Sequence, residues 1–271
     1  MKSYEVLTPS QIEQFIEEGL VIVRGVTPRD VGLRIQKQLW AKLSPKPDDP
    51  STWTERIVHL QESLKGPDVD AAYTARYVGA VNDLVGKDRW TLQKLLGWWP
   101  VTFPGFWEKP WKPPTGGWHV DGNFFHHHLN SREQGLLAIH LFSDIGPGDG
   151  GTAIILGSHL HAARVLAEHE PEGLDASKIC QLLQPYAAEN HHRAIEVQGE
   201  IGDVALMHPF MLHAFSPNTG TRPRIICNPC QSLNEPMNLR RQNPYDYSPV
   251  ESAIIRGAGD LLEKATVGTV L

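Results

Sequence analysis

Apolar residues recur at helical spacing over residues 9–18, directly after a sequence that favours a helix start. Thr8 and Gln11 have the spacing of a capping box, in which each side chain bonds the backbone of the other residue. Gly19 is placed to end this helix. The run LVIVRGV, residues 20–26, is rich in β-branched residues and predicts a strand.

Helical patterns dominate the rest of the first hundred residues. A second helix is expected to start after Thr27, where Pro28 fits the first turn. Two further patterns with an apolar stripe cover about 67–85 and 88–97. The N-terminal third is therefore predicted to be mostly helical.

From residue 99 onward, short apolar runs separated by Pro and Gly replace the helical period, which is typical of an all-β sandwich or barrel. A polar helical segment from His159 to about His192 interrupts them, and a last helix starts at Ser248 with a second capping box. Eight short strands fit a jelly roll. They are expected near 99–106, 117–122, 135–143, 152–156, 193–198, 203–208, 211–216 and 222–232.

Length and composition narrow the picture further. We expect residues 1–271 to form a single domain, with the helical third packed on the jelly-roll core, because all-β domains reach this length without dividing. The formal charge of −6 gives no support to a nucleic-acid partner. No stretch has the roughly 20 apolar residues of a membrane span. Three cysteines, an odd number, argue against a disulfide framework, so we expect a reducing, cytoplasmic setting.

The segment GGWHVDGNF contains the first candidate metal ligands. His119 and Asp121 are two residues apart on a predicted strand, so both side chains project from the same face. A third ligand must come from elsewhere, and His208 and His213 are both available on later strands. Two histidines and one carboxylate on one face of a metal form the facial triad of non-haem Fe(II) oxygenases.

The other histidines have simpler interpretations. The three consecutive residues 126–128 cannot share one face of a strand, and we expect them to form a rim of the site's mouth. His140, in the run LLAIHLF, is expected to be a hydrogen-bonded histidine of the core. His159 and His161 are expected at a helix start.

Taken in order, the motifs H-x-D, GDGGT, GSH and GDVALMHPFMLH, followed by an arginine on the next strand, resemble the phytanoyl-CoA dioxygenase family of Fe(II)/2-oxoglutarate oxygenases. The resemblance covers nearly the whole chain and implies a mainly β fold with flanking α-helices, the double-stranded β-helix, a cupin-like jelly roll. It implies that His119, Asp121 and His213 hold Fe(II). It also implies that Arg224, rather than Arg222, pairs the distal carboxylate of 2-oxoglutarate, with O2 as the second cosubstrate.

One departure from the family's pattern affects the cosubstrate pocket. The family often has a small hydroxylated residue two positions after the distal histidine, whereas this chain has Phe215 there, followed by Ser216. Since Asp121 is a carboxylate, the open position that a halide occupies in the family's halogenases is absent. Trp118, which adjoins a predicted ligand, and Asn228 are the candidate substrate residues; Trp118 could equally fill the core.

The expected function is hydroxylation of a small metabolite or natural-product intermediate, with release of succinate and CO2. The absence of a basic cluster gives no support to a CoA thioester. Desaturation, epimerisation or cyclisation with the same cofactors remain alternatives, as does a cupin-like binding protein without turnover. The sequence does not indicate an oligomeric state.

Overall fold

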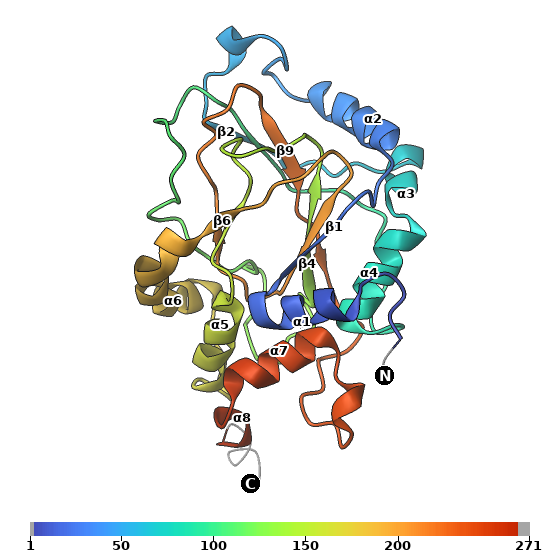
Figure 1. The fold of residues 1–271 in the computed structure, drawn as a ribbon, viewed down its shortest axis with the longest axis vertical. Helices are drawn as coiled ribbons and strands as arrows, with labels where there is room; N and C mark the ends of the chain where they lie inside the picture. Colours follow the sequence, from blue (N-terminus) through green and yellow to red (C-terminus); the bar gives the residue numbers. More distant parts are fainter. Residues whose placement is uncertain (1–2, 265–271) are drawn as a thin grey trace.

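The computed structural model describes residues 3–264, so the first two and last seven residues of the predicted domain lie outside the described part (Figure 1). Within that part, no helix is long and apolar enough to cross a membrane. The chain folds as a β core with helices around it, in agreement with the predicted mainly β class (Figure 1).

The helices begin where the sequence provides caps. The Thr8 hydroxyl accepts from the Gln11 backbone N–H, and Gly19, at a φ of 78°, ends the first helix in the left-handed conformation that glycine tolerates best. Ser248 and Glu251 form the second capping box. The helices are α1 (Pro9–Glu18), α2 (Arg29–Trp40), α3 (Pro67–Ala72), α4 (Ala75–Val85), α5 (Ser158–Ala167), α6 (Ala176–Asn190), α7 (Pro249–Ala258) and α8 (Leu261–Lys264), with short 3-10 turns at Pro50–Thr52, His191–Arg193 and Pro244–Asp246.

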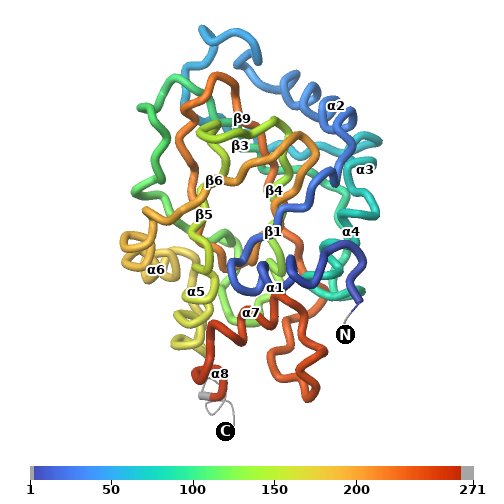
Figure 2. The backbone as a smooth tube through the Cα atoms, in the orientation of Figure 1, coloured from blue at the N-terminus to red at the C-terminus, as the bar shows by residue number. Residues whose placement is uncertain are grey.

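The strands form two antiparallel sheets. The seven-stranded sheet has the order β1-β7-β4-β9-β3-β2, with β10 paired to β4, and the three-stranded sheet has the order β6-β5-β8. Figure 2 shows β5 and β6 across the molecule from β1 and β4. The strands are β1 (Leu20–Val23), β2 (Ile57–Leu60), β3 (Trp99–Thr102), β4 (Leu136–Leu141), β5 (Ala153–Ile154), β6 (Ile195–Glu196), β7 (Val204–Met207), β8 (His213–Ala214), β9 (Arg224–Cys227) and β10 (Cys230–Gln231).

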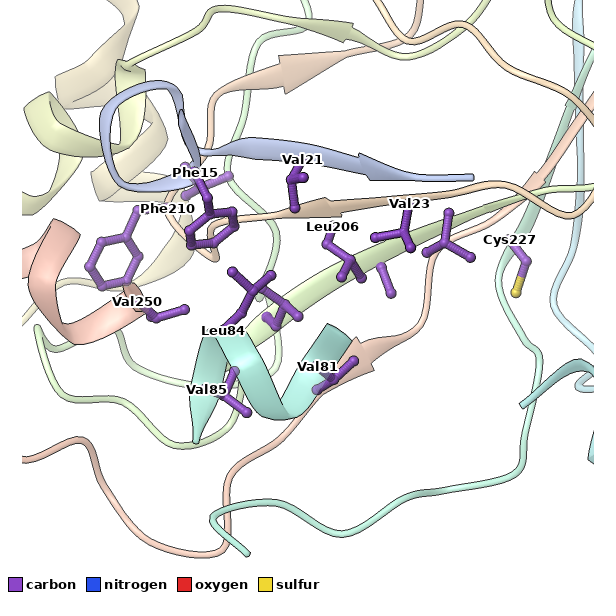
Figure 3. Close-up of a cluster of buried hydrophobic side chains, with 14 of the residues drawn as sticks. Phe15, Val21, Val23, Val81, Leu84, Val85, Leu206, Phe210, Cys227 and Val250 are labelled. Carbon is purple, nitrogen blue, oxygen red and sulfur yellow. The ribbon is translucent and has the colours of Figure 1, made fainter. Parts of the chain in front are cut away.

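The two faces of β4 belong to different apolar clusters. Leu136 and Ala138 pack in the larger cluster, where side chains of α1, α4 and α7 cover one face of the large sheet (Figure 3). Leu137 and Ile139 belong to the second cluster with residues of β5, β7 and β9. Side chains alternate along a strand, so the outer face of β4 supports the helices while its inner face meets the smaller sheet.

Three sequence predictions of secondary structure need correction. Residues 88–97 form no helix, because their backbone is engaged with distant segments through bridges that pair Leu64 with Leu96 and Trp90 with Leu233. The pattern over 67–85 is divided into α3 and α4, with Thr74 capping the second helix. The strand expected at 117–122 is reduced to a single bridge, and β2 was not predicted.

Candidate metal centre and its cavity

Three predicted ligands meet at one point between the sheets. One ligand atom from each of His119, Asp121 and His213 lies within 4.8 Å of the others. The Nε2 atoms of His119 and His213 lie 3.6 and 3.5 Å from the same carboxylate oxygen, Asp121 Oδ1. Within residues 3–264, no other set of three histidine, cysteine or acidic side chains is arranged to hold a metal ion.

The backbone explains why two histidines 94 positions apart become neighbours. His119 and His213 form an antiparallel bridge in which each N–H donates to the other's carbonyl, both at 3.0 Å. Their rings lie side by side, with centroids 4.4 Å apart. Asp121 is two residues beyond His119 and returns to the same face. The two-residue spacing of His119 and Asp121, together with the bridge between His119 and His213, therefore brings the three ligands together.

Hydrogen bonds to the backbone set the tautomer of both rings. His119 Nδ1 lies 2.8 Å from the Gly117 carbonyl, and His213 Nδ1 lies 3.0 Å from that of Met211. A carbonyl can only accept, so each Nδ1 carries the proton and each Nε2 presents a lone pair toward Asp121. Asn228 Nδ2 lies 3.4 Å from the second carboxylate oxygen, Asp121 Oδ2. This donor set fits a divalent transition metal such as iron.

The electrostatics of the triad favour an ionised carboxylate. Burial would raise the pKa of Asp121, but His213 and His119 hold it well below its usual range. Burial likewise opposes protonation of His213, yet the facing Asp121 carboxylate raises the pKa of that imidazole. The Asp121 carboxylate would attract a metal cation at this position in the same way as it attracts the proton on His213.

The triad lines a large cavity of about 1300 Å³, above the usual range for small-molecule sites. Leu137, Ile139 and Ile226 supply its apolar inner wall from β4 and β9. Asn228, a predicted substrate residue, also lines it. The cavity is therefore deep enough to hold a second molecule beside a metal-bound cosubstrate.

Arg224 is buried beside this cavity but does not line it, and among the described residues no carboxylate forms an ion pair with it, although Glu196 lies near enough to favour its charged form. It is 1% exposed and donates to two carbonyls, Nε to Gly150 at 2.7 Å and Nη1 to Pro100 at 3.1 Å, and its Nη2 has no hydrogen-bond partner within residues 3–264. Burial lowers the pKa of Arg224 to about 10, so the guanidinium stays charged at neutral pH. Thr102, its register partner on β3, has a buried hydroxyl that is also unpartnered. Two unsatisfied donors at paired positions fit an anionic oxygen.

The neighbours of these residues are differently placed. Arg222 is exposed in the loop before β9, so the regular strand that would align it with Arg224 is not formed. Phe215 lines the cavity, with its ring 5.6 Å from that of His59. Ser216 is fully buried, and its Oγ accepts from the Trp111 indole at 2.7 Å. Ser216 thus does not replace the hydroxyl missing at position 215.

His208 lies outside the triad, in contact with helices. Its ring is completely buried, 4.8 Å from that of His159, and its Nε2 lies 3.4 Å from the Val250 carbonyl in α7. His159 is in the first turn of α5, as expected. Of the two histidines that the sequence left open as the third ligand, the structure brings only His213 to the H-x-D pair.

His140 is a core residue on the outer side of β4, but the expected hydrogen bond is absent. Neither ring nitrogen has a partner among the described residues, and the ring packs against Tyr73 and Tyr77. Burial lowers the pKa of His140 to about 3. The neutral ring is held by aromatic packing alone.

The triple histidine at 126–128 does not form a rim, because none of its members lines the cavity. His127 is buried and its backbone bridges to Leu174, while His128 Nδ1 lies 3.1 Å from a Glu170 carboxylate oxygen. His126 Nε2 contacts the Glu172 carbonyl at 2.9 Å. These contacts fasten the loop to the segment ahead of α6.

Trp118 is a core residue and not a cavity residue. It is 3% exposed, and its indole N–H donates to the Pro114 carbonyl at 3.0 Å. Its side chain packs in the larger apolar cluster and does not line the cavity. Trp98, which the aromatic sequence favours as a core residue, instead lines the cavity, and the sequence interpretation missed four lining glutamines. No local signal marks the glutamines; they are Gln61, Gln93, Gln134 and Gln231.

Comparison with known proteins gives a family and a fold. The model of a family described as phytanoyl-CoA dioxygenase (PhyH) matches residues 15–226. A search of the curated proteins found no match.

Several solved structures are similar to the chain. EctD from S. alaskensis with bound Fe has 18% identity and a TM-score of 0.54, over 95% of this chain and 87% of that one. The epimerase SnoN, solved with Fe3+, α-ketoglutarate and nogalamycin RO, has 17% identity and a TM-score of 0.53, over 82% of each chain. HygX from Streptomyces hygroscopicus, solved with nickel and 2-oxoglutarate, has 17% identity and a TM-score of 0.48, over 82% of this chain and 86% of that one. The likeness to EctD and SnoN confirms the predicted double-stranded β-helix fold.

Proposed function

The chain belongs to the phytanoyl-CoA dioxygenase family of Fe(II)- and 2-oxoglutarate-dependent oxygenases, and from this membership we propose that it hydroxylates a small organic molecule. One observation supports this most strongly. Two imidazoles with free Nε2 atoms face one carboxylate oxygen at 3.5 and 3.6 Å, at the wall of a cavity large enough for a substrate. A histidine pair with a purely structural role would not need to lie at the wall of a cavity.

In this proposal His119, Asp121 and His213 hold the iron, and the backbone carbonyls of Gly117 and Met211 keep both rings in the ligating tautomer. Asn228 orients the carboxylate through Asp121 Oδ2. A metal held by these three side chains would lie at the wall of the cavity and would bind 2-oxoglutarate and O2 from that side.

Arg224 is the proposed anchor for 2-oxoglutarate. Its buried guanidinium has carbonyl partners at Nε and Nη1 but none at Nη2 among the described residues, so a carboxylate bound there would satisfy the remaining donor and offset the buried charge. The Thr102 hydroxyl, register partner of Arg224, supplies the second donor that position 215 lacks. Both residues approach Gly150: Arg224 Nε bonds its carbonyl, and Thr102 Oγ1 lies 3.1 Å from where its Cβ would be.

When bound by these residues, Fe(II) and 2-oxoglutarate would supply the O2-dependent oxidation of a substrate C–H bond, with 2-oxoglutarate converted to succinate and CO2. The protein's own residues place the substrate. The apolar wall of Leu137, Ile139 and Ile226 excludes water beside the triad, and the cavity holds the reacting carbon close to it.

Uncoupled succinate formation tests the function without knowledge of the substrate. Iron-loaded protein with 2-oxoglutarate in air should form succinate above the level of free iron, and Asp121→Asn should abolish this because one ligand loses its charge. Asp70→Asn, on an exposed carboxylate of α3, is the matched control and should behave as the parent. Folded, iron-loaded parent protein that forms no succinate would instead indicate a binding module.

A further inference from the structure

The cavity in front of the triad is almost free of charge. Among its described lining residues there is no lysine, arginine or glutamate, and Asp121 is the single carboxylate, although charged residues make up 21% of the chain. Burial and the nearby Arg224 lower the pKa of His59, so this lining histidine is neutral at pH 7. A phosphate, carboxylate or ammonium group in the outer cavity would lose hydration without meeting a counter-charge.

Neutral amides take the place of charges. Gln61, Gln93, Gln134 and Gln231 reach the cavity from four separate segments. Within residues 3–264, the side chains of Gln61, Gln93 and Gln231 make no hydrogen bond, and Gln134 uses only its Nε2, leaving a buried Oε1 unpartnered. Each amide offers both donors and an acceptor, which complements a hydroxyl group, itself a donor and an acceptor. Gln134 and Gln231 are buried, whereas Gln61 and Gln93 are exposed at the mouth of the cavity, so the two buried amides are the ones that favour a polar occupant.

Trp98 adds a flat apolar surface at the same cavity. Its φ of 60° lies in the left-handed region that a bulky residue rarely adopts, yet its side chain is 50% exposed. Strain of this kind persists where the surroundings require it and is frequent at ligand sites. Phe124 and Phe215, 65% and 36% exposed, also line the cavity. Exposed aromatic faces beside neutral amides suit a ring skeleton with polar substituents.

We propose that the substrate is an uncharged, ring-containing molecule bearing hydroxyl groups, with a ring face on Trp98 and its hydroxyls bound by the four glutamines. The proposal rests on the oxygenase function above and specifies the substrate class of that site. It disfavours CoA thioesters, phosphorylated metabolites and amino acids, all of which carry charge into the cavity.

Matched probes that differ in charge test the class without turnover. Iron-loaded protein with 2-oxoglutarate and no O2 is titrated with phenyl β-D-glucoside, phenyl β-D-glucuronide and phenyl β-D-glucosaminide, and with estradiol and estradiol 3-sulfate, by calorimetry. At least one neutral probe should bind about tenfold or more tighter than its charged counterparts, equal to about 1.4 kcal/mol. Equal or tighter binding of the charged probes, or no binding of either neutral probe at millimolar concentration, overturns the proposal.

The same preparation reports separately on the function. Uncoupled succinate formation in air tests the oxygenase, whereas the ranking of probe affinities tests the substrate class. Succinate formed by protein that prefers charged probes would overturn the class alone. No succinate from protein that prefers neutral probes would overturn the function, and with it the claim that the bound class is a substrate.

Two variants test the named residues. Gln231→Glu, an isosteric change, should shift the preference toward the glucosaminide by about tenfold relative to the glucoside, because it adds a counter-charge. Gln181→Glu, at an exposed position of α6 outside the cavity, should leave the ranking unchanged. Trp98→Gly relieves the positive φ, so the unfolding temperature should not fall while affinity for the neutral probes falls about tenfold. A lower unfolding temperature with unchanged affinity, or an unchanged ranking in Gln231→Glu, contradicts the assignment.

Discussion

Two groups of histidines lie in the interior of this protein, and only one is arranged to bind metal. His119 and His213 each have a carbonyl at Nδ1 and a shared carboxylate at Nε2. His140, His159 and His208 are buried, as is His213, but no carboxylate contacts any of these three among the described residues. Burial does not separate His213 from the second group; the neighbours of its ring nitrogens do.

The pKa shifts of the buried histidines have opposite signs in the two groups. Asp121 raises the pKa of His213 against the effect of burial. Burial lowers the pKa of His140 to about 3 and that of His159 to about 4. The first group attracts a cation, whereas protonation of the histidines in the second group would destabilise the fold.

Replacement of one histidine from each group by alanine should give the largest difference between the groups. His213→Ala should lose the bound iron and all activity, since even partners of a ligand change metal affinity by about 10- to 100-fold. His208→Ala should retain iron, while its unfolding temperature falls because a buried ring is replaced by a cavity. Iron content by mass spectrometry and thermal unfolding decide between them. Loss of iron in His208→Ala with retention in His213→Ala would reverse the assignment.

The same contrast between buried and exposed side chains separates Arg224 from Arg222. Arg224→Ala should raise the apparent dissociation constant for 2-oxoglutarate by roughly 30-fold to several thousand-fold, because truncation of a buried charge pair costs about 2 to 5 kcal/mol. Arg224→Lys should rescue poorly, since lysine lacks the planar fork. Arg222→Ala, on the exposed loop, is the matched control. A selective loss in Arg222→Ala alone would remove Arg224 as the anchor and leave the triad intact.

His140 provides a pH test of the second group. Its folded pKa of about 3 lies below the unfolded value of about 6.5, so stability is present above pH 6.5 and is lost as pH falls toward 3. His140→Phe should remove this contribution, making the loss between pH 7 and pH 5 smaller by about 2 kcal/mol. Denaturant unfolding at both pH values measures it. Identical pH dependence in parent and variant would show that His140 is not the titrating group.

The smallest expected effect concerns the hydroxyl beside Arg224. Thr102→Val keeps the shape of the side chain and removes its unpartnered Oγ1, so the apparent constant for 2-oxoglutarate should rise roughly tenfold. Iron content should not change, because Thr102 does not contact the triad. An unchanged constant would mean that the cosubstrate is held without this residue.

The sequence predicts those features that depend on neighbours along the chain. Both capping boxes, at Thr8 and Ser248, are present because their partners are three residues away. The pairing of His119 with Asp121 on one face follows from the period of a strand. Residues 88–97 were misassigned because their apolar spacing resembles a helix, while the partners that hold them, such as Leu233, are far away in sequence.

The cavity lining depends on the closure of the fold, which explains what sequence reasoning missed. Gln231 and Trp98 come together through the large sheet and the loop before β3, and neither belongs to a motif. Trp118 is a candidate because it adjoins a ligand, but its side chain is buried in the larger apolar cluster, which proximity in sequence does not reveal. The unpartnered state of Arg224 Nη2 is likewise visible only once β3 and β9 are paired.

Anaerobic addition of Fe(II) and 2-oxoglutarate to the protein tests the central claim most directly. If His119, Asp121 and His213 hold iron with open positions toward the cavity, bidentate binding of the 2-oxo acid should produce a weak visible charge-transfer absorption. The band should be absent from Asp121→Asn and from samples that receive succinate in place of 2-oxoglutarate. Protein shown to contain stoichiometric iron that develops no such band would contradict the account.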